Sequence, residues 1–288
     1  MLNLSSPAAV ASLLRRHNLR PQRKLGQNFL VDANILSKIC DSAAIAPGAG
    51  VLEIGPGLGV LTRQLAERVG ADGHVLSVEI DRGLLPALDE TVGDLPQVTI
   101  LNADALSVDF DNEAARLRLP SPLHIVANIP YQITSPLIAK FLLMKTPVSL
   151  IVLLVQKEVA TRLNARAATP EYGAFTLFVQ YYAEVELVGS VSPSCFFPPP
   201  EVTSSILRLR PRAEKEVEVA DPDLLFKVIH AGFGQRRKTL SNSLSNDPTL
   251  GWDKDRAANA LSAAQIDPGR RGETLTIAEF AKIAAAAL

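Results

Sequence analysis

Short apolar runs alternate with amphipathic stretches over the first two thirds of the chain. Seven runs predict strands, at residues 51–54, 74–80, 98–101, 124–129, 150–155, 183–191 and 204–209. After the first run, a glycine-rich turn leads into a helical stripe of Leu61, Leu65 and Val69. Strands that alternate with helices through short turns are typical of a parallel, doubly wound sheet. The pattern therefore predicts an α/β fold with a mostly parallel sheet of seven strands.

The pattern changes after residue 210. Strand-like runs stop, and helical patterns cover residues 223–233, 254–264 and 276–287. The charged, proline-bounded segment 211–222 separates the two kinds of pattern and is the expected linker. We therefore expect a larger domain over residues 1–210 and a small all-helical domain over residues 211–288.

The N-terminal segment resembles a targeting peptide only in part. It is rich in Arg and Ser and poor in acidic residues, but its basic residues follow the apolar stretch 10–14, the reverse of a secretory signal. Residues 7–18 form an amphipathic pattern with Pro7 near the first turn, which predicts a short helix. We expect an arm of the mature protein.

The overall composition narrows the class of protein. Hydrophobic residues make up 47% of the 288 positions and charged residues 20%, which excludes a disordered or collagen-like chain. The longest nearly continuous apolar run, residues 148–155, is far shorter than the about 20 residues that span a bilayer. Cys40 and Cys195 lie far apart and the four histidines are scattered, which argues against a disulfide scaffold or a zinc site. We expect a cytoplasmic protein with no metal ion and no membrane partner.

Charge is spread unevenly, although the formal net charge is only −1. One basic cluster lies in an N-terminal segment without acidic residues and another in the C-terminal third: Arg15, Arg16, Arg20, Arg23 and Lys24, then Arg236, Arg237 and Lys238. Each cluster is either a solvated face or a set of contacts to nucleic-acid phosphates. The near-neutral total excludes binding of nucleic acid through overall charge alone.

Small and acidic residues follow successive predicted strands, where a parallel sheet binds its ligands. Gly55, Gly57 and Gly59 follow the first strand, and glycine lets the backbone approach a ligand because it has no Cβ atom. Glu79 ends the second strand, where its carboxylate can accept hydrogen bonds from both hydroxyls of a ribose. Asp104 follows the third strand and can accept from an adenine amino group. These residues predict an adenosine-containing cofactor; the glycine spacing differs from the G-x-G-x-x-G of NAD sites and favours S-adenosylmethionine.

The fourth strand ends in Asn128-Ile129-Pro130-Tyr131, again at the ligand-binding edge. An exocyclic aromatic amine is a poor nucleophile because its lone pair is delocalised into the ring. The side-chain oxygen of Asn128 and the carbonyl of Pro130 can accept from its N–H groups, aim the lone pair at a methyl donor and stabilise the charge that develops on nitrogen. Tyr131 offers a flat face on which a base can stack. The motif at this position predicts amino-group methylation without a general base.

The segment Phe196-Phe197 followed by prolines at 198–200 places aromatic rings on a stiff loop. This loop either caps the sheet or clamps the second face of a base opposite Tyr131, once the base has left its stack. Both interpretations fit the sequence.

Six segments are distinctive when taken together. They are GQNFL at 26–30, EIGPGLG at 53–59, NIPY at 128–131, QKEVA at 156–160, FFPPP at 196–200 and FGQRRKTL at 233–240. In this order they resemble the KsgA family of ribosomal RNA adenine N6-dimethyltransferases over almost the whole chain. Two departures are visible: Ile129 stands where the family usually has Leu, and Glu201 stands where it usually has Lys after the prolines. Glu201 is therefore left out of the expected site.

The resemblance implies a class I Rossmann-like methyltransferase fold, with an RNA-binding helical C-terminal domain and S-adenosyl-L-methionine as the donor. It implies two methyl groups on N6 of each of two adjacent adenosines, in a hairpin loop near the 3′ end of small-subunit (16S) rRNA. The expected partner is this RNA or the 30S ribosomal particle, with a role in its biogenesis, and we expect a monomer. By position, the donor would contact Asn28, Leu30, Gly55, Gly57, Glu79, Asp104 and Asn128, and the adenine would contact Asn128, Pro130, Tyr131 and Phe196.

Three other functions stay open. Related enzymes methylate an adenine of large-subunit rRNA and confer macrolide resistance, although segment 233–240 favours the small-subunit target. An NAD-dependent oxidoreductase would fit the glycine turn and Glu79 but leaves residues 128–131 unexplained. A non-catalytic RNA-binding assembly factor would be favoured by loss of Asn128 or of the glycines, and both are intact.

Overall fold

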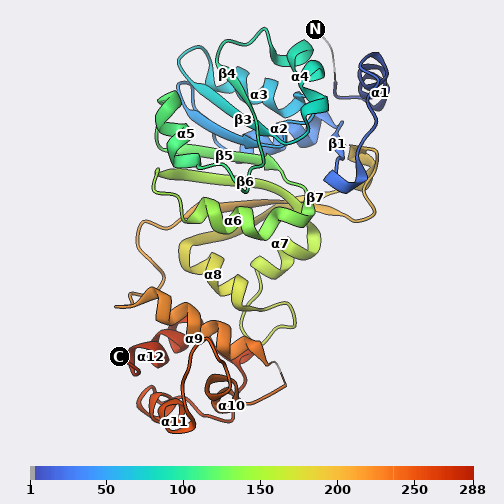
Figure 1. Cartoon of the computed structure of the whole chain (residues 1–288). Helices are drawn as coiled ribbons and strands as arrows, with labels where there is room; N and C mark the ends of the chain where they lie inside the picture. The colour runs from blue at the N-terminus through green and yellow to red at the C-terminus, as the bar shows by residue number, and fades with distance from the viewer. Residues whose placement is uncertain (1–3, 236) are drawn as a thin grey trace. The chain divides into compact units, whose positions relative to one another are not determined.

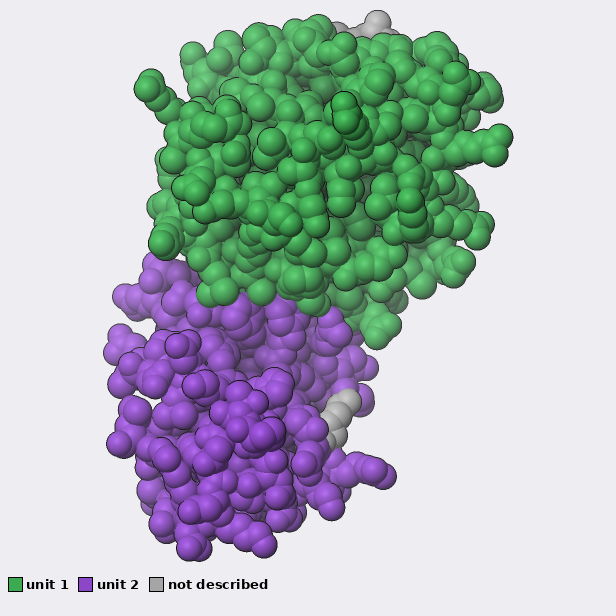
Figure 2. All heavy atoms as spheres, viewed as in Figure 1, with its two compact units in different colours: residues 1–160, 185–211 green, residues 161–184, 212–288 purple. Residues whose placement is uncertain are grey.

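The computed structural model describes residues 4–235 and 237–288 and divides the chain into two compact units (Figure 2). The first unit runs up to Ala160 and resumes over Val185–Pro211, and the second consists of Thr161–Glu184 and Arg212–Leu288. The second unit therefore takes in a segment that the sequence-based division leaves in the larger domain. Aromatic packing accounts for this difference, because the rings of Phe178 and Tyr181 each lie 5.3 Å from that of Phe226, between centroids.

A seven-stranded sheet forms the core of the first unit (Figure 1). Its strands, in spatial order, are β4 (Val98–Asn102), β3 (His74–Glu79), β2 (Gly50–Ile54), β5 (Leu123–Asn128), β6 (Val148–Gln156), β9 (Ser204–Pro211) and β7 (Ala183–Val191). The pairs β2–β3, β3–β4, β2–β5 and β5–β6 are parallel, whereas β9 runs antiparallel to β6. The prediction of an α/β fold with a mostly parallel seven-stranded sheet is confirmed.

Helices cover both faces of this sheet because its central strands are apolar on both sides. Helices α2 (Ala33–Ser42) and α3 (Val60–Val69) pack on one face, where Leu36 and Leu65 join Val51 of β2 in one apolar cluster. The alternate residue Leu52 of β2 is buried as well. Burial on both faces is the pattern of a parallel sheet enclosed by helices.

Side-chain caps precede two of the remaining helices of the first unit, α1 (Pro7–Arg16) and α5 (Phe110–Leu117). The others are α4 (Leu85–Val92) and α6 (Thr134–Leu142), with α7 (Lys157–Leu163) spanning the boundary and 3₁₀ turns η1 (Arg23–Leu25), η2 (Arg82–Leu84), η3 (Tyr131–Ile133) and η4 (Pro193–Cys195). Ser6 accepts from the Ala9 N–H ahead of α1, and Asp32 and Asp109 cap α2 and α5 in the same way.

A second, two-stranded sheet joins two segments that are distant in the chain. β1 (Phe29–Leu30) and β8 (Phe196–Phe197) pair antiparallel, with Phe29 opposite Phe197 and Leu30 opposite Phe196. Strands of two residues have no readable period, and the sequence pattern did not predict them. The pairing places the GQNFL segment against the FFPPP segment.

The second unit is all-helical. It contains α8 (Ala174–Tyr182), α9 (Pro222–Gly234), α10 (Leu240–Ser245), α11 (Lys254–Ala263), α12 (Ile277–Ala285) and the turn η5 (Gly272–Thr274). Leu225, Leu240, Trp252 and Phe280 are buried members of its apolar cluster. The predicted helical stretches 223–233, 254–264 and 276–287 each correspond to one of these helices, α9, α11 and α12.

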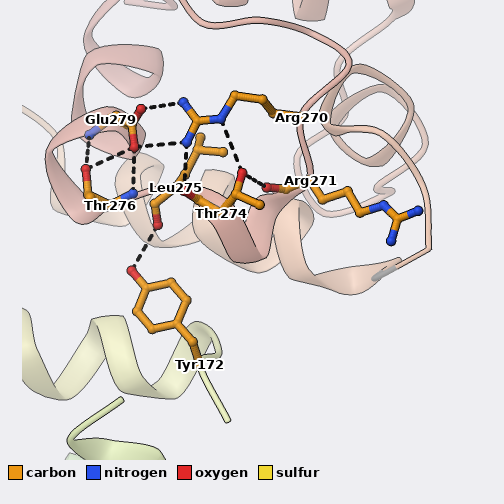
Figure 3. A network of polar contacts seen from close by, with 7 residues as sticks. All are labelled: Tyr172, Arg270, Arg271, Thr274, Leu275, Thr276 and Glu279. Carbon is orange, nitrogen blue, oxygen red and sulfur yellow. Dashed lines mark hydrogen bonds and ion pairs between the residues drawn. The ribbon is translucent and has the colours of Figure 1, made fainter. Parts of the chain in front are cut away.

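Figure 3 shows the polar network that fixes the start of α12. Thr276 caps the helix and exchanges hydrogen bonds with Glu279 in a capping box. Arg270 donates to Glu279, and this bond is the main reason that the pKa of Glu279 lies below its ordinary value. The hydroxyl of Tyr172 donates to the carbonyl of Leu275 at 3.0 Å, which ties residues 161–184 to the rest of the second unit.

Candidate cofactor and active site

A cavity lies at the carboxyl ends of β2, β3, β4 and β5, in the first unit. Nine of the residues singled out by the sequence line it: Asn28, Leu30, Gly55, Gly57, Glu79, Asp104, Asn128, Pro130 and Tyr131. They come from four strand ends and from the GQNFL segment, so the fold brings them together from distant parts of the chain. This position is where open α/β sheets bind their ligands.

The glycine turn after β2 requires its glycines. Gly55 and Gly57 have φ values of +71° and +59°, a region that other residues rarely adopt. A Cβ atom on Gly57 would stand 3.1 Å from the ring of Phe29. The N–H of Gly57 donates to Oε2 of Glu79 at 3.2 Å, which connects the turn to the end of the next strand.

Glu79 is buried, with a side chain that is held by backbone N–H groups. Besides Gly57, the N–H of Asp81 donates to its Oε1 at 2.8 Å. Burial raises the pKa of Glu79, and these two hydrogen bonds oppose the rise. The carboxylate is therefore oriented at the cavity wall, where its remaining lone pairs can accept from ligand hydroxyls.

Asp104 lies on another part of the lining, in the loop between β4 and α5. Its side chain is exposed, and its Oδ1 accepts from the Leu106 N–H at 2.9 Å. Ile80 also lines the cavity although half of its surface is exposed, and it forms an apolar wall next to Glu79. Sequence reasoning missed Ile80; the available signal was an apolar residue directly after the strand-ending carboxylate.

Asn128 has a defined side-chain orientation. Its Nδ2 donates to the backbone carbonyl of Asn28 at 3.1 Å. The amide nitrogen is thereby engaged with the segment before β1, and the oxygen Oδ1 is the atom of the side chain that can accept from a ligand. This is the orientation that the interpretation of the Asn128–Tyr131 motif requires.

The carbonyl of Pro130 already has a donor. The N–H of Ile133 donates to it at 3.1 Å, which closes the turn η3. A carbonyl can accept twice, so the predicted role of Pro130 is retained as a prediction. The neighbouring Ile129 also lines the cavity, and its carbonyl is a second acceptor that sequence reasoning did not consider.

Tyr131 is half-buried, and its hydroxyl forms a 2.7 Å hydrogen bond with the hydroxyl of Ser204 on β9. Burial raises the pKa of the Tyr131 hydroxyl. The bond anchors the far end of the ring to the sheet. A ring fixed in this way is a rigid surface for stacking.

Phe196, which the resemblance places against the target adenine, lies in the core in this structure. Only 3% of it is exposed, it belongs to the apolar cluster of α2 and α3, and it lies outside the lining of the cavity. Phe197, the next residue of β8, is half-buried and packs with the cluster that contains Phe29. Of the two loop interpretations, the structure displays the one in which Phe196 caps the core, and its contact with a base stays a prediction.

The segment before β1 is held to the cavity by Asp81, a buried residue that sequence reasoning missed. Gln22 and Gln27 both donate to its Oδ2, at 2.8 and 2.6 Å, and the Gly83 N–H donates to its Oδ1. The sequence around Gln22 and Gln27 does not predict their hydrogen bonds to Asp81.

Glu53 lies directly beneath the glycine turn and is fully buried. The hydroxyls of Thr62 and Ser77 both donate to its Oε2, at 2.7 and 2.6 Å, while Oε1 has no hydrogen-bond partner among the described residues. Burial raises the pKa of Glu53 to about 7. The side chain faces the interior rather than the cavity, since it does not contribute to the lining.

The two basic clusters belong to different units. In the first unit Arg15, Arg20, Arg23 and Lys24 are at least partly exposed, whereas Arg16 forms an ion pair with Glu90. In the second unit Arg237 and Lys238 are exposed, and Arg236 lies outside the described residues. The N–H of Leu240 donates to the carbonyl of Arg270 at 2.7 Å, so exposed Arg271 lies on a loop next to the second cluster.

The chemistry of the lining distinguishes two kinds of cofactor. The described residues that line the cavity include the carboxylates of Glu79 and Asp104 but neither lysine nor arginine. This set suits a cofactor that carries a positive sulfonium better than one that carries two phosphates. Over residues 4–235 and 237–288 there is no cluster of His, Cys, Asp or Glu that could hold a metal ion and no helix able to cross a membrane.

Comparisons with known proteins agree with this description. The family profile described as ribosomal RNA adenine dimethylase matches residues 18–287. A protein of Pelotomaculum thermopropionicum named ribosomal RNA small subunit methyltransferase A is 45% identical, over 99% of this chain and 97% of that protein. A dimethyladenosine transferase of Plasmodium falciparum superposes with a TM-score of 0.74 at 25% identity, over 88% of this chain and 95% of that one. For the 23S rRNA methyltransferase ErmE the TM-score is 0.66 at 29% identity, over 90% and 99%.

Proposed function

The chain belongs to the ribosomal RNA adenine dimethylase family, and from this premise we propose that it dimethylates N6 of two adjacent adenosines in a hairpin loop near the 3′ end of small-subunit (16S) rRNA. It is a methyltransferase that uses S-adenosyl-L-methionine. The observation that carries the proposal is the oriented side chain of Asn128, at the end of β5 in a cavity with the glycine turn and Glu79.

The donor would be held by the residues that the sequence assigned to it: Asn28, Leu30, Gly55, Gly57, Glu79, Asp104 and Asn128. When bound, it supplies an electrophilic methyl carbon on a sulfonium. Glu79 would accept from the ribose hydroxyls, Asp104 would accept from the adenine amino group, and Ile80 would offer the adenine an apolar surface. Because Gly55 and Gly57 have no Cβ atom, the backbone of this turn could approach the donor closely.

The target adenine would be held at the other end of the cavity. The Oδ1 of Asn128 accepts from one N6–H, and a backbone carbonyl of Ile129 or Pro130 accepts from the other. Both acceptors are fixed before the substrate arrives, so they stabilise the positive charge that develops on N6 without having to reorganise. Tyr131 stacks against the base, and the amine loses its proton to solvent only after transfer, so no general base is needed.

Phe196 would join Tyr131 around the base only after leaving the core. Its 3% exposure means that stacking requires the β1–β8 pairing to shift when RNA binds. We propose this movement as part of substrate binding; it gives up the burial of the Phe196 ring, which stacking on the base would have to offset.

RNA binding beyond the target base would use the exposed basic residues. In the first unit these are Arg15, Arg20, Arg23 and Lys24; Arg16, paired with Glu90, contributes less. In the second unit they are Arg236, Arg237 and Lys238, of which the last two are exposed, and we propose that this unit is the RNA-binding domain. Phosphate contacts of this kind suit the recognition of a structured loop by shape.

The small-subunit target is favoured over the large-subunit one by the degree of similarity. The chain is 45% identical to a relative named for the small subunit, against 29% for ErmE. We further propose that it acts as a monomer in the cytoplasm on a 30S ribosomal particle, with a role in biogenesis of the subunit.

The test is a transfer assay with mapping. Unmodified small-subunit particles and large-subunit RNA are incubated separately with labelled S-adenosylmethionine, and methylated adenosines are located in each. The proposal predicts label on N6 of two adjacent adenosines of small-subunit RNA. Label only on large-subunit RNA would support the macrolide-resistance type, and binding to particles without transfer would support an assembly factor.

A further inference from the structure

Lys140 on α6 reaches across to the loop that follows β4. Its ammonium donates to the backbone carbonyls of Ala105 at 3.1 Å and Leu106 at 2.7 Å. It also lies 4.8 Å from the centre of the ring of Phe110, the first residue of α5. A charged donor shared between two neighbouring carbonyls is a strong and specific contact.

This loop forms one wall of the cavity. Residues 103–105 line it, and Asp104 is the predicted acceptor for the adenine of the donor. Inside the loop, Asp104 accepts from the Leu106 N–H through its side chain and from the Ser107 N–H through its carbonyl. These hydrogen bonds tie Asp104 to Leu106 and Ser107, so a contact that holds Leu106 also bears on the position of the Asp104 carboxylate.

A second set of hydrogen bonds joins the start of α5 to the segment after α6. The carboxylate of Asp111 accepts from the N–H groups of Lys145 and Thr146, which fixes the first turn of α5. Lys140 contacts the loop itself, at Ala105 and Leu106, and the Ala103 N–H ties the start of the loop to the carbonyl of Glu79. Burial lowers the pKa of Lys140, while Asp109 and Asp104 oppose this and favour its charged form.

Helix α6 directly follows the other half of the site. It begins at Thr134, directly after the turn η3 that contains Tyr131. Lys140 of α6 binds the β4–α5 loop. It therefore connects the adenine end of the proposed donor site with the segment proposed to hold the target base.

We propose that Lys140 is a positioning residue for the donor, which sets the β4–α5 loop at the adenine end of the cavity. The inference rests on the proposed function, because it takes the cavity to bind S-adenosylmethionine. Lys140 touches neither the donor nor the target base. Its loss lowers affinity for the donor and leaves the chemistry at the methyl group intact.

The test compares Lys140→Met, which keeps the aliphatic stem, with Lys140→Arg, which keeps a charged donor. Arg63→Met is the matched control, because Arg63 donates to the backbone carbonyl of Thr91 at 3.0 Å outside the cavity lining. Calorimetric titration with S-adenosylhomocysteine measures affinity, and steady-state transfer gives KM for S-adenosylmethionine and kcat. Lys140→Met should weaken binding of S-adenosylhomocysteine and raise KM for S-adenosylmethionine about five- to tenfold, with kcat within twofold of the wild type. Lys140→Arg should recover most of the affinity. Arg63→Met should match the wild type in all three quantities.

A second measurement does not depend on a ligand. Hydrogen exchange of the unliganded protein should speed up at the amides of residues 104–108 in Lys140→Met and not in Arg63→Met. Unchanged affinity together with unchanged exchange in Lys140→Met would overturn the proposal, as would an equal loss of affinity in Arg63→Met. If the wild type failed to bind S-adenosylhomocysteine, the proposed function would fail, and the exchange data would still decide whether Lys140 holds the loop.

Discussion

The side-chain nitrogen of Asn128 donates to the backbone carbonyl of Asn28, a residue 100 positions earlier in the chain, at 3.1 Å. This hydrogen bond engages Nδ2 of Asn128 and leaves Oδ1 as the side-chain atom that can accept from a ligand. It also connects the motif that would hold the target base with the segment that would cover the donor. One contact therefore orients an acceptor and joins two segments that both line the cavity.

The glycine turn gives a prediction for donor binding. Gly57→Ala should destabilise the protein by about 1–2 kcal/mol because φ is +59°, and should weaken S-adenosylhomocysteine binding more than tenfold because the new methyl group meets Phe29. Gly48→Ala is the matched control, since Gly48 also has a positive φ but nothing within 4 Å of its Cβ position. Calorimetry should show that Gly57→Ala loses affinity for S-adenosylhomocysteine and Gly48→Ala does not. Wild-type affinity in Gly57→Ala would remove Gly57 from the donor site.

Glu53 gives a prediction for stability against pH. Its pKa is raised from 4.5 to about 7 in the folded protein, so folding favours the protonated form. This contribution, about 3 kcal/mol, is fully present below pH 4.5 and is lost as the pH rises through about 7. Glu53→Gln, which cannot ionise, should lose less stability between pH 5 and 8 than the wild type in urea unfolding. Identical slopes in that window would show that Glu53 stays ionised.

The C-terminal basic cluster gives a prediction for RNA binding. Replacing Arg236, Arg237 and Lys238 with Ala should weaken binding to small-subunit RNA. The slope of log K against log salt should fall by about one for each phosphate that the variant no longer neutralises. Lys254→Ala removes an exposed charge from α11 of the same unit and serves as the control. An unchanged salt slope in the triple variant would assign the cluster to solvent.

Substitution of the two phenylalanines of β8 by alanine should destabilise the protein to different extents. Phe196→Ala should lower the free energy of unfolding by about 3–5 kcal/mol because the ring is almost fully buried. Phe197→Ala should lower it much less, since that ring is only half-buried. Urea unfolding of both variants tests this difference, and equal losses would show that the core does not depend on Phe196.

The strands and the cavity could be predicted because they depend on local pattern and on one rule of topology. Continuous apolar runs marked β2, β3 and β5, and parallel strands place their carboxyl ends at one edge, which brings Gly55, Glu79 and Asn128 together. The residues favoured S-adenosylmethionine as the donor, and the family resemblance supplied the RNA target. The residue types and their spacing predicted which side chains meet at the cavity.

Contacts between distant segments could not be predicted. The β1–β8 pairing involves two residues on each side, too few to show a period, and it buries Phe196 where the sequence predicts a ring that contacts a base. Asp81 and Lys140 bind side-chain amides or backbone carbonyls of segments distant in the chain, and nothing in the sequence around either residue predicts this. The segment 161–184 joins the helical unit through aromatic contacts that its sequence alone does not direct to α9.

The role of Asn128 is tested most directly by single-turnover methyl transfer at saturating S-adenosylmethionine, on unmodified small-subunit particles. Asn128→Ala should reduce the rate of transfer roughly 10²-fold or more, as for loss of one preorganised polar group. Its affinity for S-adenosylhomocysteine should stay within a few fold of the wild type. A rate equal to that of the wild type would contradict the account, because the oxygen at the end of β5 would then have no part in holding the reacting amine.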